Sequence, residues 1–153
     1  MRHPVRILLV APHSLGELRG NTVTLARLAA GLRAAGAHVK LLGPEQPAPR
    51  GHFDVIHAFH ATKAGPRALE LAARTKAELV VTLTGTDINQ DLFDPQRGMV
   101  VRRVLGQAAA LVVFSAAGRA RLGRHSKSWA AKTRVIPAAV APPFFACGAG
   151  HKG

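Results

Sequence analysis

The sequence has no tyrosine, one tryptophan and one cysteine among its 153 residues. The single Cys147 allows no disulfide within the chain, and no activating base stands beside it, so we expect this thiol to be chemically idle. With so few aromatic side chains, the stacking platforms of single-strand nucleic-acid binders are scarce. The apolar segment 7–10 is too short to cross a membrane, and residues 11–13 lack a secretory cleavage pattern. These absences predict a cytoplasmic protein without a transmembrane segment.

Acidic residues are also few, since 8 Asp and Glu stand against 21 Lys and Arg and the formal net charge is +13. This excess favours an anionic partner, and nucleic acid is a candidate because Lys and Arg neutralise its phosphates. Segment 119–134 gathers basic residues without an acid, namely Arg119, Arg121, Arg124, Lys127, Lys132 and Arg134. We interpret this cluster either as a solvated face or mobile loop, or as an anion site or docking surface for a further domain.

Apolar runs alternate with helical periodicity along the chain. Continuous apolar runs bounded by turn residues are typical of parallel strands covered on both faces. They predict strands at 5–11, 38–42, 54–59, 79–83, 110–114 and 134–137. Helices are predicted at 21–36, 65–76, from 95 onward and 115–122. Asn21 and Ser115 are the expected N-caps, and Gly36 is expected to end the first helix.

This alternation predicts an α/β fold, a Rossmann-like three-layer sandwich with a mainly parallel sheet of about six strands. A chain of 153 residues can bury one core, so we expect a single domain at residues 1–140. Pro142, Pro143 and the glycines that follow predict a linker or disordered tail at 141–153.

One buried strand runs directly into a small polar turn. The turn consists of Thr84, Gly85, Thr86 and Asp87. In open α/β sheets, ligands bind beyond the carboxyl ends of the strands, so these hydroxyls and this carboxylate can meet a polar substrate there. The alternative is an ordinary turn in which Asp87 caps the next helix. Ser115 also follows a strand, but its neighbours lack the glycines of a nucleophile elbow.

The loop between the first strand and the first helix is a second candidate site. Gly20 lets the backbone approach a ligand, and the free amides at a helix start attract anions. With Arg19 alongside, Gly20, Asn21 and Thr22 suit a phosphate group. Three glycines at the dinucleotide spacing are missing, which disfavours NAD. The alternative is a loop glycine followed by a plain N-cap.

His57 and His60 lie three residues apart at the end of the third predicted strand. In a strand this spacing directs the two side chains to opposite faces, so no metal site is predicted. His57 is interpreted as a core or hydrogen-bonded histidine. His60 lies past the strand end and can reach the crevice of Thr84 and Asp87.

Several short patterns then occur in order at consistent spacings. They are Gly20; Leu28-Ala29, Leu32 and Gly36-x-His38-Val39; Asp54-Val55-Ile56-His57-Ala58; Val81-Thr82-Leu83-x-Gly85-Thr86-Asp87; Leu111-Val112-Val113-x-Ser115; and Arg134-Val135-Ile136-Pro137. From about Val5 to Val140, the chain resembles the N-terminal domain of a family 4 glycosyltransferase with the GT-B fold.

That resemblance implies one half of a retaining glycosyltransferase. This half would hold the acceptor, and a second Rossmann-like domain would hold a UDP-sugar or similar nucleotide sugar, with no further cofactor. The glutamate-bearing donor motif of that domain is absent, so we expect this chain to need a C-terminal domain in cis or in trans for activity. By position, Thr84 and Asp87 would be catalytic. The implied substrate-binding residues are Arg19, Gly20, Asn21, His60, Gly85, Thr86 and Ser115.

Two positions depart from the family pattern. Thr84 stands where these enzymes commonly have His, and Ala138-Ala139 stands where they commonly have Asn-Gly. The combination Gly20-Asn21-x-Val23-Thr24 with 83–87 is more similar to the selenosugar synthases of selenoneine biosynthesis. In that branch the acceptor is selenophosphate and the donor is UDP-N-acetylglucosamine, which implies an anionic acceptor near Arg19.

A different class of function also fits the sequence. A basic Rossmann-like module that stands alone and binds RNA or a protein partner would need no cleft and would show steep salt dependence. A flavodoxin-like regulator is disfavoured, because residues 5–12 contain no acidic residue.

Overall fold

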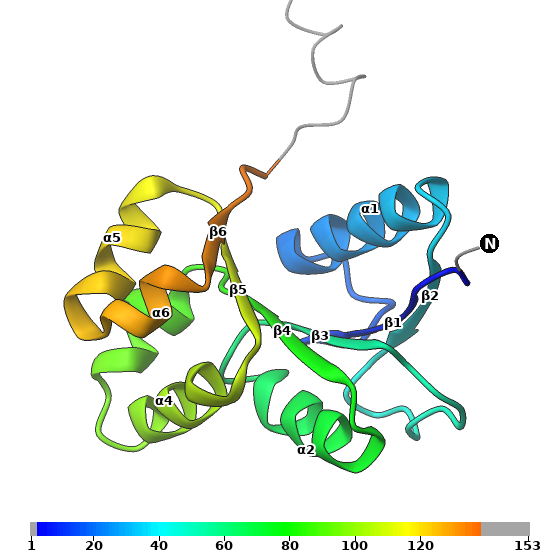
Figure 1. Ribbon diagram of the computed structural model, residues 1–153, viewed down its shortest axis with the longest axis horizontal. Coiled ribbons are helices and arrows are strands. Elements are labelled where there is room, and N and C mark those ends of the chain that lie inside the picture. Colours follow the sequence, from blue (N-terminus) through cyan, green and yellow to red (C-terminus); the bar gives the residue numbers. More distant parts are fainter. Residues whose placement is uncertain (1–2, 139–153) are drawn as a thin grey trace, which may run out of the picture.

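The computed structural model describes residues 3–138, which form an α/β fold around one sheet (Figure 1). All six strands are parallel, and their order is β2-β1-β3-β4-β5-β6. The strands are β1 (Arg6–Val10), β2 (His38–Leu42), β3 (Val55–Phe59), β4 (Glu78–Thr82), β5 (Ala110–Val113) and β6 (Thr133–Val135). Because the strands are parallel, their carboxyl ends meet at one edge of the sheet.

Helices cover the two faces of the sheet unequally. Figure 1 shows α1 (Gly20–Ala34) over one face, and α2 (Gly65–Thr75) and α4 (Arg97–Gln107) against the other. Two short elements, α3 (Thr86–Asn89) and the 3-10 turn η1 (Asp91–Phe93), lead from β4 to α4. At the opposite edge from β2, α5 (Ala116–His125) and α6 (Lys127–Ala131) lie beside β6.

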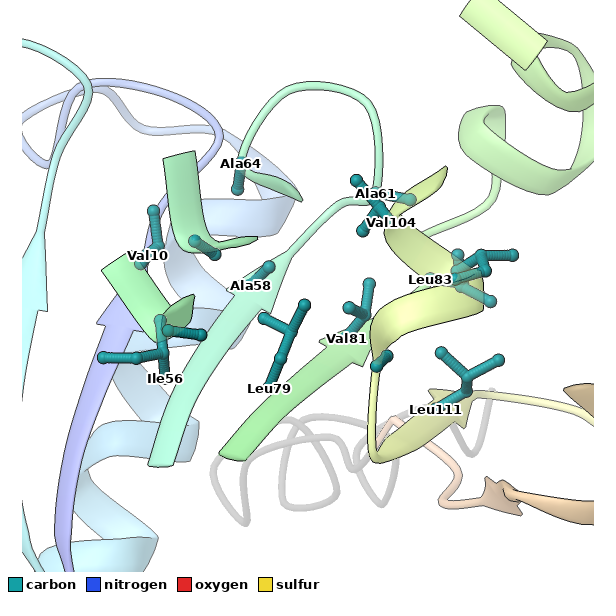
Figure 2. Packing of buried hydrophobic residues seen from close by; sticks show 14 of the residues in the cluster. Val10, Ile56, Ala58, Ala61, Ala64, Leu79, Val81, Leu83, Val104 and Leu111 are labelled. Carbon is teal, nitrogen blue, oxygen red and sulfur yellow. The ribbon is translucent and has the colours of Figure 1, made fainter. Parts of the chain in front are cut away.

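The main core lies between the sheet and the pair α2 and α4. Successive strand residues point to opposite faces, so Leu8, Ile56, Val81 and Leu111 face this side. Figure 2 shows part of this cluster, to which 23 buried residues belong. On the α1 side a separate cluster has seven, namely Ile7, Leu9, Ala11, Leu25, Ala29, Val39 and Phe59. The α1 side is therefore the thinner layer.

Glycine sets the spacing of the two helices under the sheet. A Cβ on Gly65, at the start of α2, would lie 2.9 Å from Cγ1 of Val104 on α4. Any larger residue at position 65 would push α2 and α4 apart. This close approach supports the dense packing of the main core.

The structure confirms the predicted α/β fold, and each strand lies within two residues of its predicted bounds. Gly36 ends α1 as predicted, with a φ of 93°. Ser115 is the N-cap of α5, because its hydroxyl accepts a 3.1 Å hydrogen bond from the Gly118 amide. Residues 139 and 140 of the predicted domain, and the whole predicted tail 141–153, lie outside the described residues.

Several local predictions need correction. Asn21 is not the N-cap of α1, since the helix begins at Gly20 and Arg19 takes the cap position. Thr22 closes this turn instead, accepting a 3.0 Å hydrogen bond from the Arg19 amide. The helix predicted from residue 95 begins at Arg97, after Asp94 accepts hydrogen bonds from the amides of residues 96 and 97.

The basic segment 119–134 is not a mobile loop. Two helices and a strand run through it, and its side chains hold parts of the fold together. Nζ of Lys132 donates to the carbonyl of Ala108 at 2.7 Å, just beyond the end of α4. Nε of Arg119 donates to the carbonyl of Ala130 at 3.3 Å. Part of the charge of this cluster therefore serves to connect α4, α5 and α6.

Candidate functional site

The strand order itself indicates where a ligand would bind. From β1 the chain first passes to β2 on one side and then to β3 on the other, so the direction of winding changes between β1 and β3. In open α/β sheets, ligands bind in the crevice that opens at the carboxyl edge at such a switch point. Here the loop 11–19 after β1 and the loop 60–64 after β3 lie on either side of the switch point.

Basic side chains meet at this switch point. Nζ of Lys63 lies 3.5 Å from Nε2 of His13, although the two residues are 50 positions apart. The pKa of His13 is lowered, first by partial burial and then by the charges of Lys63 and Arg19. Because its lowered pKa leaves His13 neutral near pH 7, Nε2 can accept a hydrogen bond from the Lys63 ammonium, whose exposed charge remains available to an anion. The loops after β1 and β3 thus form the charged half of the carboxyl edge: His13, Arg19 and Lys63.

The start of α1 lies in the charged half. Gly20 and Asn21 provide the first amides of the helix, which have no partners within the helix and carry its positive dipole end. Arg19 is exposed and forms a 2.5 Å ion pair with Glu17, a contact of the kind that contributes little at a surface. The structure therefore brings Arg19, Gly20 and Asn21 together with His13 and Lys63.

His60 joins the loops after β3 and β4. Its side chain is 1 % exposed, and its φ of 97° is in a region that non-glycine residues rarely adopt. Nδ1 accepts hydrogen bonds from the amides of Thr62 and Lys63 at 3.2 and 3.3 Å. The ring proton is therefore on Nε2, which donates to the Thr86 hydroxyl at 2.9 Å. Burial lowers the pKa of His60, against the opposing charge of Asp87.

Asp87, which is fully buried, also connects the loops after β3 and β4. Its carboxylate accepts hydrogen bonds from the amides of Ala61, Thr84 and Gly85 at 3.0, 3.1 and 2.9 Å. The side chain has no exposed surface, so it does not line the open crevice in which the sequence placed it. Its position fixes the turn at Thr84 and Gly85, where Gly85 has a φ of 129°.

A small pocket opens between the turn after β4 and the start of α5. Its volume is about 310 Å³, and three of the predicted residues line it, namely Thr84, Gly85 and Ser115. Asn89 and Arg121 line it as well, and the sequence analysis did not select them as site residues. Arg121 belonged to the basic cluster, whereas Asn89 ends the short helix α3, which was not predicted, and gave no signal. The sequence also did not select His13 and Lys63, which become neighbours only through the strand order.

His57 faces the α1 side of the sheet, away from this edge. Its Nε2 lies 2.7 Å from the Thr82 hydroxyl, and burial lowers its pKa to about 4. It is therefore the hydrogen-bonded histidine that the sequence predicted. Within residues 3–138, no group of three or more His, Cys, Asp and Glu side chains is placed to hold a metal ion.

The same described part of the chain contains no helix of the length and apolar character required to cross a lipid bilayer.

The fold is shared with two solved structures of the protein Alr3699/HepE. Anabaena HepE in complex with UDP-glucose matches 90 % of this chain with a TM-score of 0.60 and 18 % identity. HepE in complex with UDP and glucose matches 91 % with a TM-score of 0.58 and 16 % identity. In both comparisons 47 % of the HepE chain is covered, so this chain spans about half the length of those structures.

Sequence comparison gives a more specific result. No curated protein matches the chain significantly. A family model described as the glycosyl transferase 4-like domain matches residues 48–139, which include β3 to β6 and therefore the His60 and Asp87 loops. This match covers more than half of the sequence, and with the resemblance found in the motifs it identifies the chain as a member of the glycosyl transferase 4-like domain family.

Proposed function

We propose that residues 1–140 form the acceptor-side domain of a retaining glycosyltransferase that uses a nucleotide sugar. A C-terminal donor-binding domain, in cis or in trans, would complete the enzyme. The observation that carries the proposal is the arrangement of the carboxyl edge. Basic side chains gather at the switch point, and the same edge carries a pocket whose lining includes Thr84, Asn89 and Ser115.

The two parts of this edge suit the two chemical features of such a reaction. Phosphate oxygens carry negative charge, and the charged half offers Arg19, Lys63 and the first amides of α1 to an anion. Sugar hydroxyls need donors and acceptors, and the pocket offers Thr84, Ser115 and the Asn89 amide group. We therefore assign phosphate binding to the charged half and sugar binding to the pocket.

In the proposed reaction, the bond between the sugar C1 atom and the nucleotide phosphate breaks, and a bond from C1 to the acceptor forms on the same face. Negative charge develops on the departing nucleotide, and groups already oriented toward it stabilise the transition state. His60 and Asp87 take part as positioning residues, because both are buried. Thr86 is exposed and accepts its hydrogen bond from His60, so its own hydroxyl proton can be donated to a ligand.

The acceptor itself we propose to be an anion, as in the selenosugar synthases that the motifs resemble. Lys63, in contact with His13, supports this, since its ammonium offers a second basic contact beyond the start of α1. The rival proposal, an RNA-binding module, is weakened by the basic cluster at 119–134, because Arg119 and Lys132 already donate to carbonyls of the chain.

The test begins with the intact gene product from its source. A mass about twice that of this chain, as a second domain of typical size requires, identifies the enzyme to assay. In that enzyme, Arg19→Glu should raise the Michaelis constant of the anionic acceptor at least tenfold, and it should also raise that of the donor, whose phosphates we assign to the same half. An unchanged acceptor constant would contradict an anionic acceptor at this site. The absence of transfer from any nucleotide sugar, with salt-dependent RNA binding instead, would contradict the enzymatic proposal.

A further inference from the structure

The outer face of α1 carries no acidic residue. Figure 1 shows α1 as the only helix on its side of the sheet, and within residues 3–138 no other element lies over it. Its inner face packs into the core through Leu25 and Ala29. Apart from glycines, the exposed residues of α1 are Val23, Ala26, Arg27, Ala30, Arg33 and Ala34. A surface helix normally presents a polar face to water, so this face of Val, Ala and Arg indicates contact with another surface.

Two exposed aliphatic side chains stand at the start of the same helix. Leu18 is 95 % exposed, and Val23 is 47 % exposed. Arg19 is the N-cap residue, so these two side chains come directly before the cap and at the fourth helical position. Such a pair often packs together as a hydrophobic staple, but Leu18 is too exposed to be packed in this way. Leu18 and Val23, which we call the apolar tip, are therefore open to solvent in the part of the chain that the structure describes.

Positive charges flank the apolar tip. Arg19 follows Leu18 directly, Arg27 lies one helical turn after Val23, and both arginines are exposed. Glu17 is the one acidic residue between positions 11 and 34, and it is already paired with Arg19 at 2.5 Å. The stem of an arginine can lie along apolar material while its guanidinium reaches a charged group. Exposed aliphatic groups beside such arginines are typical of surfaces that lie on anionic membranes.

We propose that the apolar tip and the outer face of α1 dock onto an anionic lipid surface. Leu18 enters the boundary between headgroups and acyl chains, and Arg27 contacts the lipid phosphates. A fluid bilayer receives a protruding aliphatic side chain without a matching cavity, and its negative surface potential attracts a chain with a net charge of +13. A second copy of the chain is a poorer partner, because two such charges repel. This inference goes beyond the proposed function and does not depend on it.

The first test is cosedimentation of the wild-type chain with lipid vesicles at physiological salt. Vesicles of phosphatidylcholine that contain phosphatidylglycerol should bind the chain, and vesicles of phosphatidylcholine alone should bind much less of it. Absence of binding to the anionic vesicles would overturn the proposal. Equal binding to both kinds of vesicle would overturn it as well, because the lipid charge would then be irrelevant.

A second test addresses the apolar tip with the same anionic vesicles. Leu18→Ser should lower the partition coefficient about tenfold, because the aliphatic side chain that enters the membrane is lost. Phe93→Ser is the matched control, since it removes a ring that is 59 % exposed on η1, outside the docking surface. It should change the partition coefficient by less than about twofold. Equal losses in the two variants would contradict the proposal. Circular dichroism verifies that each variant is folded.

A third test addresses the charge, with substitutions on opposite faces of the sheet. Arg27→Gln on α1 and Arg103→Gln on α4 each remove one positive charge from an exposed position. The first should weaken binding to the anionic vesicles about fivefold, and the second by less than about twofold. Equal losses would show that net charge alone attracts the chain and would overturn docking through α1. Without vesicles, sedimentation equilibrium should give the mass of a monomer. A dimer that Leu18→Ser dissociates would overturn the proposal in favour of a second copy.

Discussion

The two halves of the carboxyl edge differ in what their polar groups bind. In the half formed by the loops after β4 and β5, together with His60 at the end of β3, the side chains of His60, Asp87 and Ser115 all have hydrogen-bond partners within the chain. We call this the paired half. In the charged half, His13 and Lys63 face each other at 3.5 Å, and Arg19 is exposed.

This difference indicates that one half stabilises the fold and the other half binds a ligand. Buried groups that accept several amide hydrogen bonds stabilise the folded chain, and losing one leaves donors without partners. In the charged half, Lys63 and Arg19 make only exposed contacts, which contribute little to stability and leave their charges available to a ligand of opposite charge. The charged half should therefore be the part that recognises a ligand, and the paired half the part that holds the loops in place.

The largest effect is expected when the paired half is broken at its centre. Asp87→Asn replaces a carboxylate that accepts three amides from two loops by a group that must turn an NH₂ toward one of them. The free energy of unfolding should fall by about 3–4 kcal/mol, measured by urea denaturation. Asp94→Asn is the control, since Asp94 also accepts two amides but is partly exposed, and it should lower the free energy of unfolding much less than Asp87→Asn. Equal losses would show that the burial of Asp87 is unimportant.

Acid should destabilise the folded chain through His57, which lies on the α1 face of the sheet, away from both halves of the edge. Burial lowers the pKa of His57 from 6.5 to about 4. Between these pH values the unfolded chain binds a proton that the folded chain does not, so the free energy of unfolding falls as the pH drops from 6.5 to 4. The loss reaches about 3 kcal/mol at most. In His57→Gln, which keeps a hydrogen-bonding group beside Thr82, this pH slope should be shallower. Parallel slopes for the two proteins would rule out His57 as the cause.

In the charged half, a substitution should weaken ligand binding and leave the stability of the folded chain nearly unchanged. Lys63→Met keeps the length of the side chain but removes its charge, and it should raise the dissociation constant of inorganic phosphate about tenfold, or about 1.4 kcal/mol. The free energy of unfolding should stay within about 0.5 kcal/mol of the wild type. Lys40→Met, on β2 and away from the switch point, should change neither quantity. A large loss of stability in Lys63→Met would place this residue in the paired half instead.

The smallest effect concerns the cap of α5. Ser115→Ala removes the hydroxyl that accepts from the Gly118 amide, and it should cost about 1 kcal/mol in thermal or urea unfolding. Ser126→Ala is its control, because the Ser126 side chain makes no capping hydrogen bond to α6, and a cost below about 0.5 kcal/mol is expected. If both substitutions lower the free energy of unfolding equally, the hydrogen bond from the Gly118 amide to Ser115 does not stabilise the folded chain.

The sequence predicts the sheet well because buried parallel strands are continuous apolar runs with clear ends. It does not predict α3, Thr86–Asn89, since four residues contain too little periodicity to distinguish a helix from a turn. The cap of α1 was wrong for a related reason. Asn21 and Thr22 are both capable of capping, and only the course of the loop decides that Thr22 bonds to the Arg19 amide.

For the site, the sequence indicates which loops matter but not how their side chains are arranged. Thr84, Gly85 and Ser115 do line one pocket, as residues that follow neighbouring strands should. The inward direction of Asp87 could not be predicted, because it depends on the amide of Ala61 from another loop. The pairing of His13 with Lys63 likewise depends on β1 lying next to β3, which local patterns do not specify.

The central claim is that the charged half binds a ligand and the paired half holds the loops in place. Its most direct test is a titration of the ¹⁵N-labelled chain with inorganic phosphate, followed by amide chemical shifts. The account predicts saturable shifts at residues 13–22 and 60–64, weakened about tenfold in Lys63→Met, with little change at 84–89 and 115–118. Saturable shifts centred on 84–89 and 115–118, or no saturable shifts at all, would contradict it.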